Sequence, residues 1–351
     1  MIDALRAPFP WFGGKRRAAG LVWPRFGPVS GYVEPFFGSG AMLLGRPSVS
    51  GHETVNDLDG LVANFWRAVK LFPGDVAAHA DNPVNENDLH ARHLWLVSVM
   101  GELSSALNGD PDFCDPKIAG HWVWGIASWI GPGFCSGRGP WVAIGGKMVD
   151  SRKLPHLGTD GMGVNRKLPH LGDDGRGVNR KLPHLGTDGM GVNRKLPHLG
   201  SDGRGGFIRD WMARLSSRLR EVRVASGDWS RVVGPSVTRG TKSSPCAVFL
   251  DPPYAGVSDG LYSAGDSSVS RQVGEWAIEH SDDRTLRIAI CGYEGEHAMP
   301  AEWECVSWNA GAGYGGQAEE RSENGKKERI WFSPSCIRKQ GANLDIFGEA
   351  S

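Results

Sequence analysis

The run Asp-Pro-Pro-Tyr at residues 251–254 follows the apolar segment CAVFL and joins a carboxylate to an aromatic ring. Asp251 and the Pro252 carbonyl can accept hydrogen bonds from an exocyclic amine, and the ring of Tyr254 can stack on the base that carries this amine. Because Pro252 and Pro253 fix φ twice in succession, the acceptor and the ring keep their relation without a ligand. The run therefore suits a base that has been flipped out of its helix and offered amine first to an electrophilic methyl group.

Two further acids, Glu34 and Asp57, also follow short apolar segments. After Glu34, the run PFFGSG supplies Gly38 and Gly40, which allow a sharp turn and a close approach of the backbone to a ligand. Asp57 is placed to accept hydrogen bonds from ribose hydroxyls, and Leu58 could lie against a base. The run lacks both the dinucleotide fingerprint and the Walker residues, so it predicts a ligand that contains a nucleoside but no polyphosphate.

The elements that must position these residues alternate between strands and helices. The segments GYVE and HETVND read as strands, and each is followed by a helical segment. The second of these helices carries Leu61, Phe65, Val69 and Phe72 at helical spacing. Later segments CAVFL, LRIAICGY and RIWFS read as strands, with a helix through VSRQVGEWAIEHS. This order predicts an α/β fold with a parallel sheet, whose ligands lie beyond the carboxyl ends of the strands.

A 14-residue repeat occupies residues 152–205, beginning with RKLPHLGTDGMGVN. One proline and three glycines per unit exclude a continuous helix, so we expect compact, turn-rich units that pack on one another. Each unit has one histidine, and a structural role for it is favoured over a metal site.

Charge is distributed unevenly along the chain. The whole sequence balances 39 Lys and Arg against 39 Asp and Glu, but residues 151–240 hold 17 basic and 8 acidic side chains. This local excess predicts contact with a phosphate backbone, the alternative being a solvated basic face. Four tryptophans lie just upstream, and core packing is favoured over base stacking for these side chains, which are Trp122, Trp124, Trp129 and Trp141.

The remaining composition bounds the cellular context. Six cysteines contain no C-x-x-C pair, which argues against a zinc ribbon or a disulfide framework. No segment reads as a signal peptide or a membrane span. We expect a soluble protein in a reducing cytoplasm, with no membrane partner; that it is a monomer and that the cell is bacterial or phage-infected are further expectations, which composition does not give and which accompany the family resemblance described next.

Four motifs in this order, PFPWFGGK, EPFFGSG, NDLD and DPPY, resemble those of the S-adenosylmethionine-dependent DNA N6-adenine methyltransferases of the Dam-like (D12) class. The resemblance covers about half of the chain, and the repeats have no counterpart in Dam. It implies a Rossmann-like methyltransferase sheet with an inserted target-recognition region, S-adenosyl-L-methionine as cofactor, no metal, and double-stranded DNA as partner. It implies cofactor contacts for Trp11, Lys15, Glu34, Pro35, Phe36, Gly38, Gly40, Asp57 and Asp251, and catalytic roles for Asp251, Pro252, Pro253 and Tyr254.

On this interpretation the chain divides into four parts. Residues 1–71 form the cofactor-binding part of the catalytic domain, and residues 241–334 form the part that contains DPPY. Residues 72–240 form the inserted DNA-binding region, and residues 335–351 form a flexible tail. The expected reaction is direct transfer of a methyl group to the exocyclic amine of a flipped adenine.

Three alternatives stay open at this point. A cytosine-N4 methyltransferase uses the same kind of amine, and Asp rather than Ser at position 251 favours adenine by resemblance only. Methylation of RNA is a weaker option. The third open alternative is a non-catalytic DNA-binding protein that uses the repeats. A cytosine-C5 methyltransferase is not among the three, because it would need a cysteine nucleophile and strand packing explains Cys246 better.

The tail contains a possible docking motif. Its apolar side chains resemble the sliding-clamp binding pentapeptide, with Asn replacing Gln and Ile replacing Leu, and the alternative is a tail that folds back on its own core. The predicted clamp contacts are Asn343, Leu344, Asp345, Ile346 and Phe347.

Overall fold

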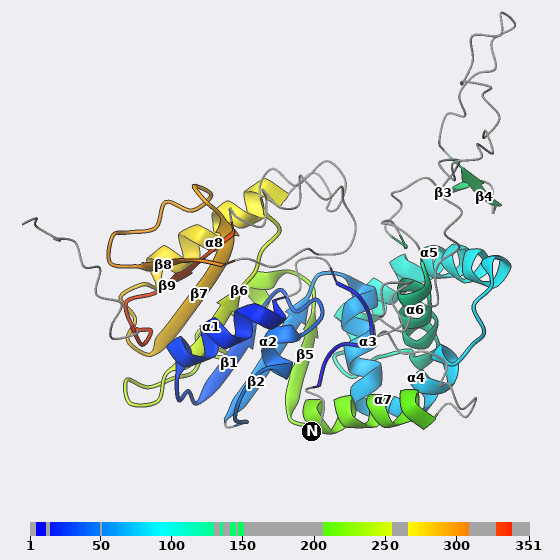
Figure 1. Cartoon of the computed structure of the whole chain (residues 1–351), viewed down its shortest axis with the longest axis horizontal. Coiled ribbons are helices and arrows are strands. Elements are labelled where there is room, and N and C mark those ends of the chain that lie inside the picture. The colour runs from blue at the N-terminus through cyan, green and yellow to red at the C-terminus, as the bar shows by residue number, and fades with distance from the viewer. Residues whose placement is uncertain are drawn as a thin grey trace, which may run out of the picture.

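A seven-stranded mixed sheet forms the centre of the protein (Figure 1). The computed structural model describes residues 5–11, 15–49, 51–129, 134–135, 141–144, 147–150, 206–254, 266–308 and 328–338. In these residues the strand order is β5-β2-β1-β6-β7-β9-β8. The strands are β1 (Gly31–Glu34), β2 (His52–Asp57), β5 (Val222–Ser226), β6 (Cys246–Leu250), β7 (Leu286–Tyr293), β8 (Glu304–Ser307) and β9 (Glu328–Phe332). The first five are parallel, whereas β9 runs antiparallel to both β7 and β8.

The sheet confirms the α/β class that the sequence predicts. Strands β6 and β7 span the segments CAVFL and LRIAICGY without a shift, and every residue of β6 is buried. Parallel strands that are covered on both faces consist of continuous apolar residues, so the sequence predicts both β6 and β7 correctly. The repeats at 152–205 and the tail motif at 343–347 lie outside the described residues, so the expectations for them stay predictions.

Two apolar cores cover the two faces of the sheet. Ala247 and Phe249 pack with α1 (Arg16–Phe26), α2 (Ala41–Leu44) and α3 (Gly60–Leu71). The alternate residues Val248 and Leu250 pack instead with α8 (Asp266–Glu279) and the short 3₁₀ helix η1 (Trp229–Val232). Because successive side chains of a strand point to opposite faces, β6 contributes to both cores and is held rigidly between them.

Four further helices gather with α3 at the β5 end of the sheet (Figure 1). They are α4 (Pro73–Ala80), α5 (Glu86–Gly109), α6 (Pro116–Ser128) and α7 (Gly206–Leu219). Trp122 and Trp124 are buried here, as the core interpretation of these side chains predicts. A separate antiparallel hairpin joins β3 (Trp141–Ile144) and β4 (Lys147–Asp150). Within the described residues no helix has the length and apolar character needed to cross a bilayer.

The structure differs from the sequence-based division in the region that follows the repeats. Residues 206–232, assigned above to the inserted region, form α7, β5 and η1, and β5 pairs in parallel with β2 at the edge of the sheet. A second difference concerns Phe72, which lies beyond the end of α3 and is 46% exposed. The cause is Pro73, which begins α4 and disfavours a helical conformation for the residue before it.

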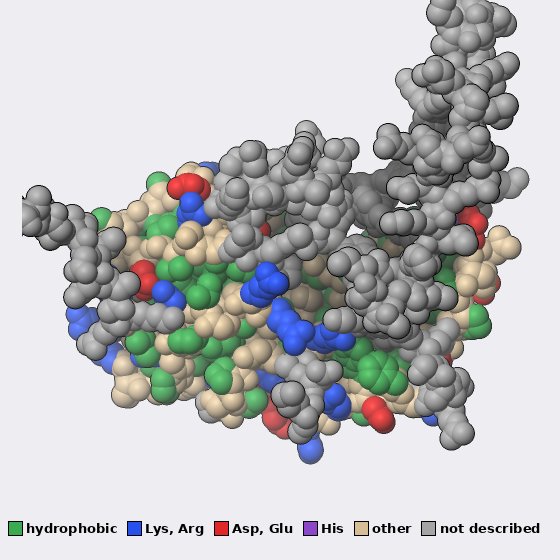
Figure 2. Space-filling view, viewed as in Figure 1, with side chains coloured by type: hydrophobic (Ala, Val, Ile, Leu, Met, Phe, Trp, Pro, Cys, Tyr) green, Lys and Arg blue, Asp and Glu red, His purple; other side chains and the backbone are tan. Residues whose placement is uncertain are grey.

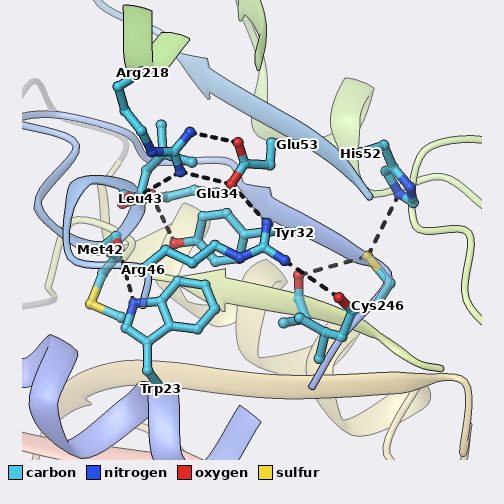
Figure 3. A network of polar contacts seen from close by, with 12 residues as sticks. Trp23, Tyr32, Glu34, Met42, Leu43, Arg46, His52, Glu53, Arg218 and Cys246 are labelled. Carbon is cyan, nitrogen blue, oxygen red and sulfur yellow. Dashed lines mark hydrogen bonds and ion pairs between the residues drawn. The ribbon is translucent and has the colours of Figure 1, made fainter. Parts of the chain in front are cut away.

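A buried ion network fixes α7 to the sheet (Figure 3). The Glu53 carboxylate on β2 accepts hydrogen bonds of 2.7 Å from the guanidinium groups of both Arg46 and Arg218. Arg218 belongs to α7 and also donates to the Leu43 carbonyl at 3.0 Å. This arginine was part of the predicted basic surface, but its charge is used inside the protein.

Candidate active site

The carboxyl ends of β1 and β6 meet at the switch point of the sheet. From β1 the chain continues to β2 and β5 on one side, whereas β6 and β7 lie on the other side. In open α/β sheets, ligands bind in the crevice outside the strand ends at such a point. Glu34 ends β1 and Asp251 directly follows β6, so the structure places both acids at this crevice.

The glycine-rich loop after β1 wraps around the end of β2. Gly38 and Gly40 have φ values of 47° and 62°, which only glycine adopts readily. The backbone N–H of Gly38 donates to the Asp57 carboxylate at 2.7 Å, and the Trp66 indole donates to the Gly38 carbonyl at 2.8 Å. A side chain at position 38 would overlap the indole of Trp11. The loop, Asp57 and Trp11 therefore form one packed unit, as their predicted shared role requires.

Asp57 is half-buried and already holds two backbone donors, the N–H groups of Gly38 and Asp59, the second at 2.9 Å. Burial, together with the charge of Asp59, raises the pKa of the Asp57 carboxyl to about 7. The adjacent Leu58 side chain is 75% exposed, so it offers apolar surface beside a hydroxyl acceptor. This pairing suits the sugar and base of a nucleoside.

On the opposite side of the switch point, Lys15, Asp251 and Tyr254 form a closed triangle. The Lys15 ammonium donates to the Tyr254 hydroxyl at 2.7 Å and lies 3.1 Å from Oδ1 of Asp251. The Tyr254 hydroxyl in turn donates to the same Asp251 oxygen at 3.0 Å. Oδ2 of Asp251 accepts no hydrogen bond from the described residues and is open to a further donor.

Electrostatics keeps this triangle in one protonation state. Burial lowers the pKa of the Lys15 ammonium, but the charges of Asp251, Cys291 and Glu328 act against it and the net pKa is raised above its usual range. Burial and the Asp251 charge raise the pKa of the Tyr254 hydroxyl well above 10. At neutral pH the lysine is therefore charged and the tyrosine is neutral, so both act as hydrogen-bond donors.

Three residues of this site were missed by the sequence analysis. The Lys15 ammonium lies 5.4 Å from the ring centre of Trp308, and Tyr293 meets the Tyr254 ring edge to face at 4.8 Å. Glu328 pairs with Tyr293 across β9 and β7, and its buried Oε2 has no hydrogen-bond partner within the part of the chain that the structure describes. Tyr293 could have been found, because it ends a buried parallel strand as the predicted acids do.

The loop after β5 adds a second group of residues that the sequence analysis missed. The Asn56 side chain donates to the Gly227 carbonyl at 2.9 Å, and the Gly227 N–H donates to the Asp57 carbonyl at 3.0 Å. Trp229 stacks on Phe36 with ring centres 6.3 Å apart. The ends of β1, β2 and β5 are thus tied together. The run Gly-Asp-Trp directly after the segment VRVAS could have indicated this group, because it places a glycine, an acid and an aromatic residue at the end of a strand.

Glu34 lies at the predicted position, at the end of β1. It is buried and accepts a hydrogen bond from the Tyr32 hydroxyl at 2.8 Å. Burial, with contributions from the charges of Asp251 and Asp57, raises the pKa of its carboxyl well above the usual value. The surroundings of Glu34 therefore favour the protonated form of its carboxyl more than water does.

Cys246 lies at the amino end of β6, far along the strand from Asp251. Its side chain is buried, and burial raises the pKa of the thiol to about 12. A buried neutral thiol at the wrong end of the strand is no nucleophile. The packing interpretation of this cysteine therefore holds, which removes the support for a cytosine-C5 mechanism.

The fold and site together define an α/β protein with a candidate ligand crevice at the switch point of a mostly parallel sheet. No protein-family model matches the chain, and no curated protein is significantly similar to it in sequence.

Proposed function

We propose that the protein is a DNA methyltransferase that transfers the methyl group of S-adenosylmethionine to the N6 amine of a flipped adenine. The observation that carries the proposal is the triangle of Lys15, Asp251 and Tyr254 at the end of β6, opposite the loop that holds Asp57. It unites an amine acceptor and an aromatic ring with an acceptor for ribose hydroxyls at one crevice. The ordered motifs in the sequence support the same assignment.

The residues around Asp57 fit the proposed cofactor. Asp57 accepts from ribose hydroxyls, Leu58 contacts the adenine, and the Gly38 turn allows the backbone to approach closely. S-adenosylmethionine, when bound, supplies an electrophilic methyl group. The Lys15 ammonium lies beside Asp251 and two aromatic rings, and this group of side chains would hold the end of the cofactor that carries the methyl group.

The chain contributes positioning and electrostatics rather than a covalent intermediate. Oδ2 of Asp251 and the Pro252 carbonyl accept the two amino hydrogens, which leaves the nitrogen lone pair directed at the methyl group. The neutral Tyr254 ring stacks on the base, and its hydroxyl is held by Lys15 and Asp251. Because these groups are fixed before the substrate arrives, little reorganisation is needed during the reaction.

The direct test is to incubate the purified protein with DNA and S-adenosylmethionine and to identify the methylated nucleoside by mass spectrometry. N6-methyladenine is expected. N4-methylcytosine would support the alternative base, for which the same triangle is equally suited. Cofactor binding without any methylated base would favour the non-catalytic DNA-binding alternative.

Asp57 gives a prediction for cofactor binding and its pH dependence. Asp57→Ala should weaken binding by an amount that reflects lost hydrogen bonds of about 1 to 3 kcal/mol. Because the Asp57 carboxyl has a pKa of about 7 and ribose hydroxyls donate to its ionised form, affinity for wild type should fall as the pH is lowered from 8 to 6. Calorimetry on Asp57→Asn is the control, and its affinity should not follow this pH dependence.

The contribution of Asp57 to the stability of the free protein should have a pH dependence opposite to that of cofactor affinity. The folded pKa of Asp57 lies above its ordinary value of 3.8, so the folded chain binds this proton more tightly than the unfolded chain does. The contribution of Asp57 to stability therefore rises as the pH falls through 7 toward 3.8. An affinity that is lower at pH 6 is thus not explained by destabilisation through this residue.

Double-stranded DNA is the proposed partner, with the sliding clamp as a second partner through the tail. Figure 2 shows Lys and Arg side chains gathered in the middle of the viewed face, over the region between α1 and α3.

Deleting one repeat unit, residues 166–179, should lower the affinity for DNA and its salt dependence while sparing cofactor binding. Anisotropy of labelled DNA and calorimetry check the two parts. Loss of cofactor binding as well would assign the repeats to the catalytic core.

A further inference from the structure

A second hollow, of about 440 Å³, lies beside the edge strand β5, with β2 and β1 between it and β6. Helices α3 and α5, strand β5, η1 and the turn after α5 contribute its walls. Neither the triangle at Asp251 nor the loop at Asp57 lines it, so it is a separate feature of the surface.

Four basic side chains line this hollow, and one acid, Asp112, accompanies them. Among the described residues none of the four basic groups forms an ion pair. Arg223 is exposed. Burial lowers the pKa of Arg67, and the charges of Asp110 and Asp112 act against this effect. Four lining cations against one lining acid leave a local excess of positive charge, and an anion between the cations would offset it. The basic residues are Arg67, Lys70, Arg223 and Arg231.

Three of these cations also cap the free edge of β5. Lys70 donates to the Val222 carbonyl at 2.8 Å, and Arg67 donates to the Val224 carbonyl at 2.9 Å. Arg231 donates to the Ser226 carbonyl at 2.7 Å, which completes an alternate set along the strand. These bonds protect the edge from pairing with another strand. They fix the cations in place without neutralising them, because a carbonyl carries no net charge, and Asp112 is the one acid that lines the hollow with them.

We propose that this hollow binds a phosphate group, and that Arg67, Arg223 and Arg231 are its ligands. A guanidinium presents a planar fork of donors that matches a phosphate. Arg67 uses Nε and Nη1 in bonds to backbone carbonyls, and Arg231 uses Nη1, so the Nη2 group of each has no bond within the described residues. The phosphate comes either from a DNA backbone or from a free nucleotide. Arg223 and Arg231 both belong to the arginine-rich segment 206–240, which favours the backbone of DNA.

Arg223→Ala is the informative variant, because Arg223 is exposed and makes no capping bond to β5. The matched control is Arg271→Ala, which removes one exposed arginine from α8 on the other side of the sheet. With the full-length protein, anisotropy of a short labelled duplex across a salt series should show binding weakened roughly threefold to tenfold by Arg223→Ala. The salt slope should fall by about one, and Arg223→Lys should restore most of the affinity.

A second arm uses inorganic phosphate and a nucleoside monophosphate, measured by calorimetry at constant ionic strength. Weaker duplex binding by Arg223→Ala with no binding of either small anion identifies the DNA backbone as the source. Binding of the small anions that Arg223→Ala weakens, with duplex binding unchanged, identifies a free nucleotide. If Arg223→Ala and Arg271→Ala behave alike in both arms, the site does not exist. The outcome is independent of methyl transfer, since an inactive protein would still bind phosphate here.

Discussion

Asp251→Asn is expected to lower the rate of methyl transfer by about 10²-fold to 10³-fold or more, the range seen when one preorganised polar group is removed from an active site. The carboxylate makes two contacts that depend on its charge, with the Lys15 ammonium at 3.1 Å and the Tyr254 hydroxyl at 3.0 Å. The proposed function adds a third, from the amine of the target base to Oδ2. An amide keeps the shape of the side chain but weakens each of them.

The choice of asparagine follows from the structure. The sequence alone predicts that Asp251→Ala would abolish transfer and leave the fold largely intact, because the residue follows a strand rather than lying in the core. The structure shows that Asp251 is the ion-pair partner of Lys15, which is 5% exposed. Alanine would leave this buried ammonium without its carboxylate, at a cost to stability. Asparagine still offers an oxygen to Lys15, so it separates catalysis from folding.

The measurement is single-turnover methylation of DNA by wild type and Asp251→Asn, with thermal unfolding and cofactor affinity as controls. A folded variant that binds cofactor but does not transfer methyl supports the proposed role. Near-normal turnover would remove Asp251 from the chemistry. Asp251→Ala adds a comparison, since a much lower melting temperature in alanine than in asparagine would show that an oxygen acceptor for the buried Lys15 ammonium contributes to stability.

The strand ends were predictable, because an acid or aromatic after a buried apolar segment is a local signal. Glu34, Asp57, Asp251 and Tyr254 therefore lie where the sequence predicts. The resemblance assigned Lys15 and Tyr254 to one site, but it did not predict the direct hydrogen bond between them across 239 residues, nor the approach of Trp308 and Tyr293 to the same groups. Charge patterns and repeats carry no information on which distant segments approach one another.

The edge of the sheet was also missed, for a physical reason. β5 is a short edge strand, and its residue Arg223 is exposed, so the segment VRVAS lacks the continuous apolar character of β6. Because β5 follows the repeats and α7 in the chain, it was grouped with them. Its pairing with β2 is what brings Gly227 and Trp229 to the candidate active site.

Glu53→Ala is expected to lower the free energy of unfolding by about 3 to 5 kcal/mol, the cost of breaking a buried ion pair by removing one partner. Glu53 and Arg46 side chains are each 2% exposed, and that of Arg218 is 13% exposed. Both guanidinium groups point at this one carboxylate (Figure 3). Without Glu53, both arginines lose the carboxylate that they share, while the bonds of Arg46 to the Val29 carbonyl and of Arg218 to the Leu43 carbonyl stay.

Urea unfolding of wild type and Glu53→Ala measures this difference, and Glu275→Ala provides the matched control. Glu275 pairs with Arg271 at the same 2.7 Å, but both side chains are more than half exposed, so its loss should cost at most about 0.5 kcal/mol. Equal losses in the two variants would show that burial adds nothing to the Glu53 network. A large loss for Glu53→Ala alone would show that the network holds α7 on β2. Because β2 ends at Asp57, the same contacts then connect the region after the repeats to the proposed cofactor site.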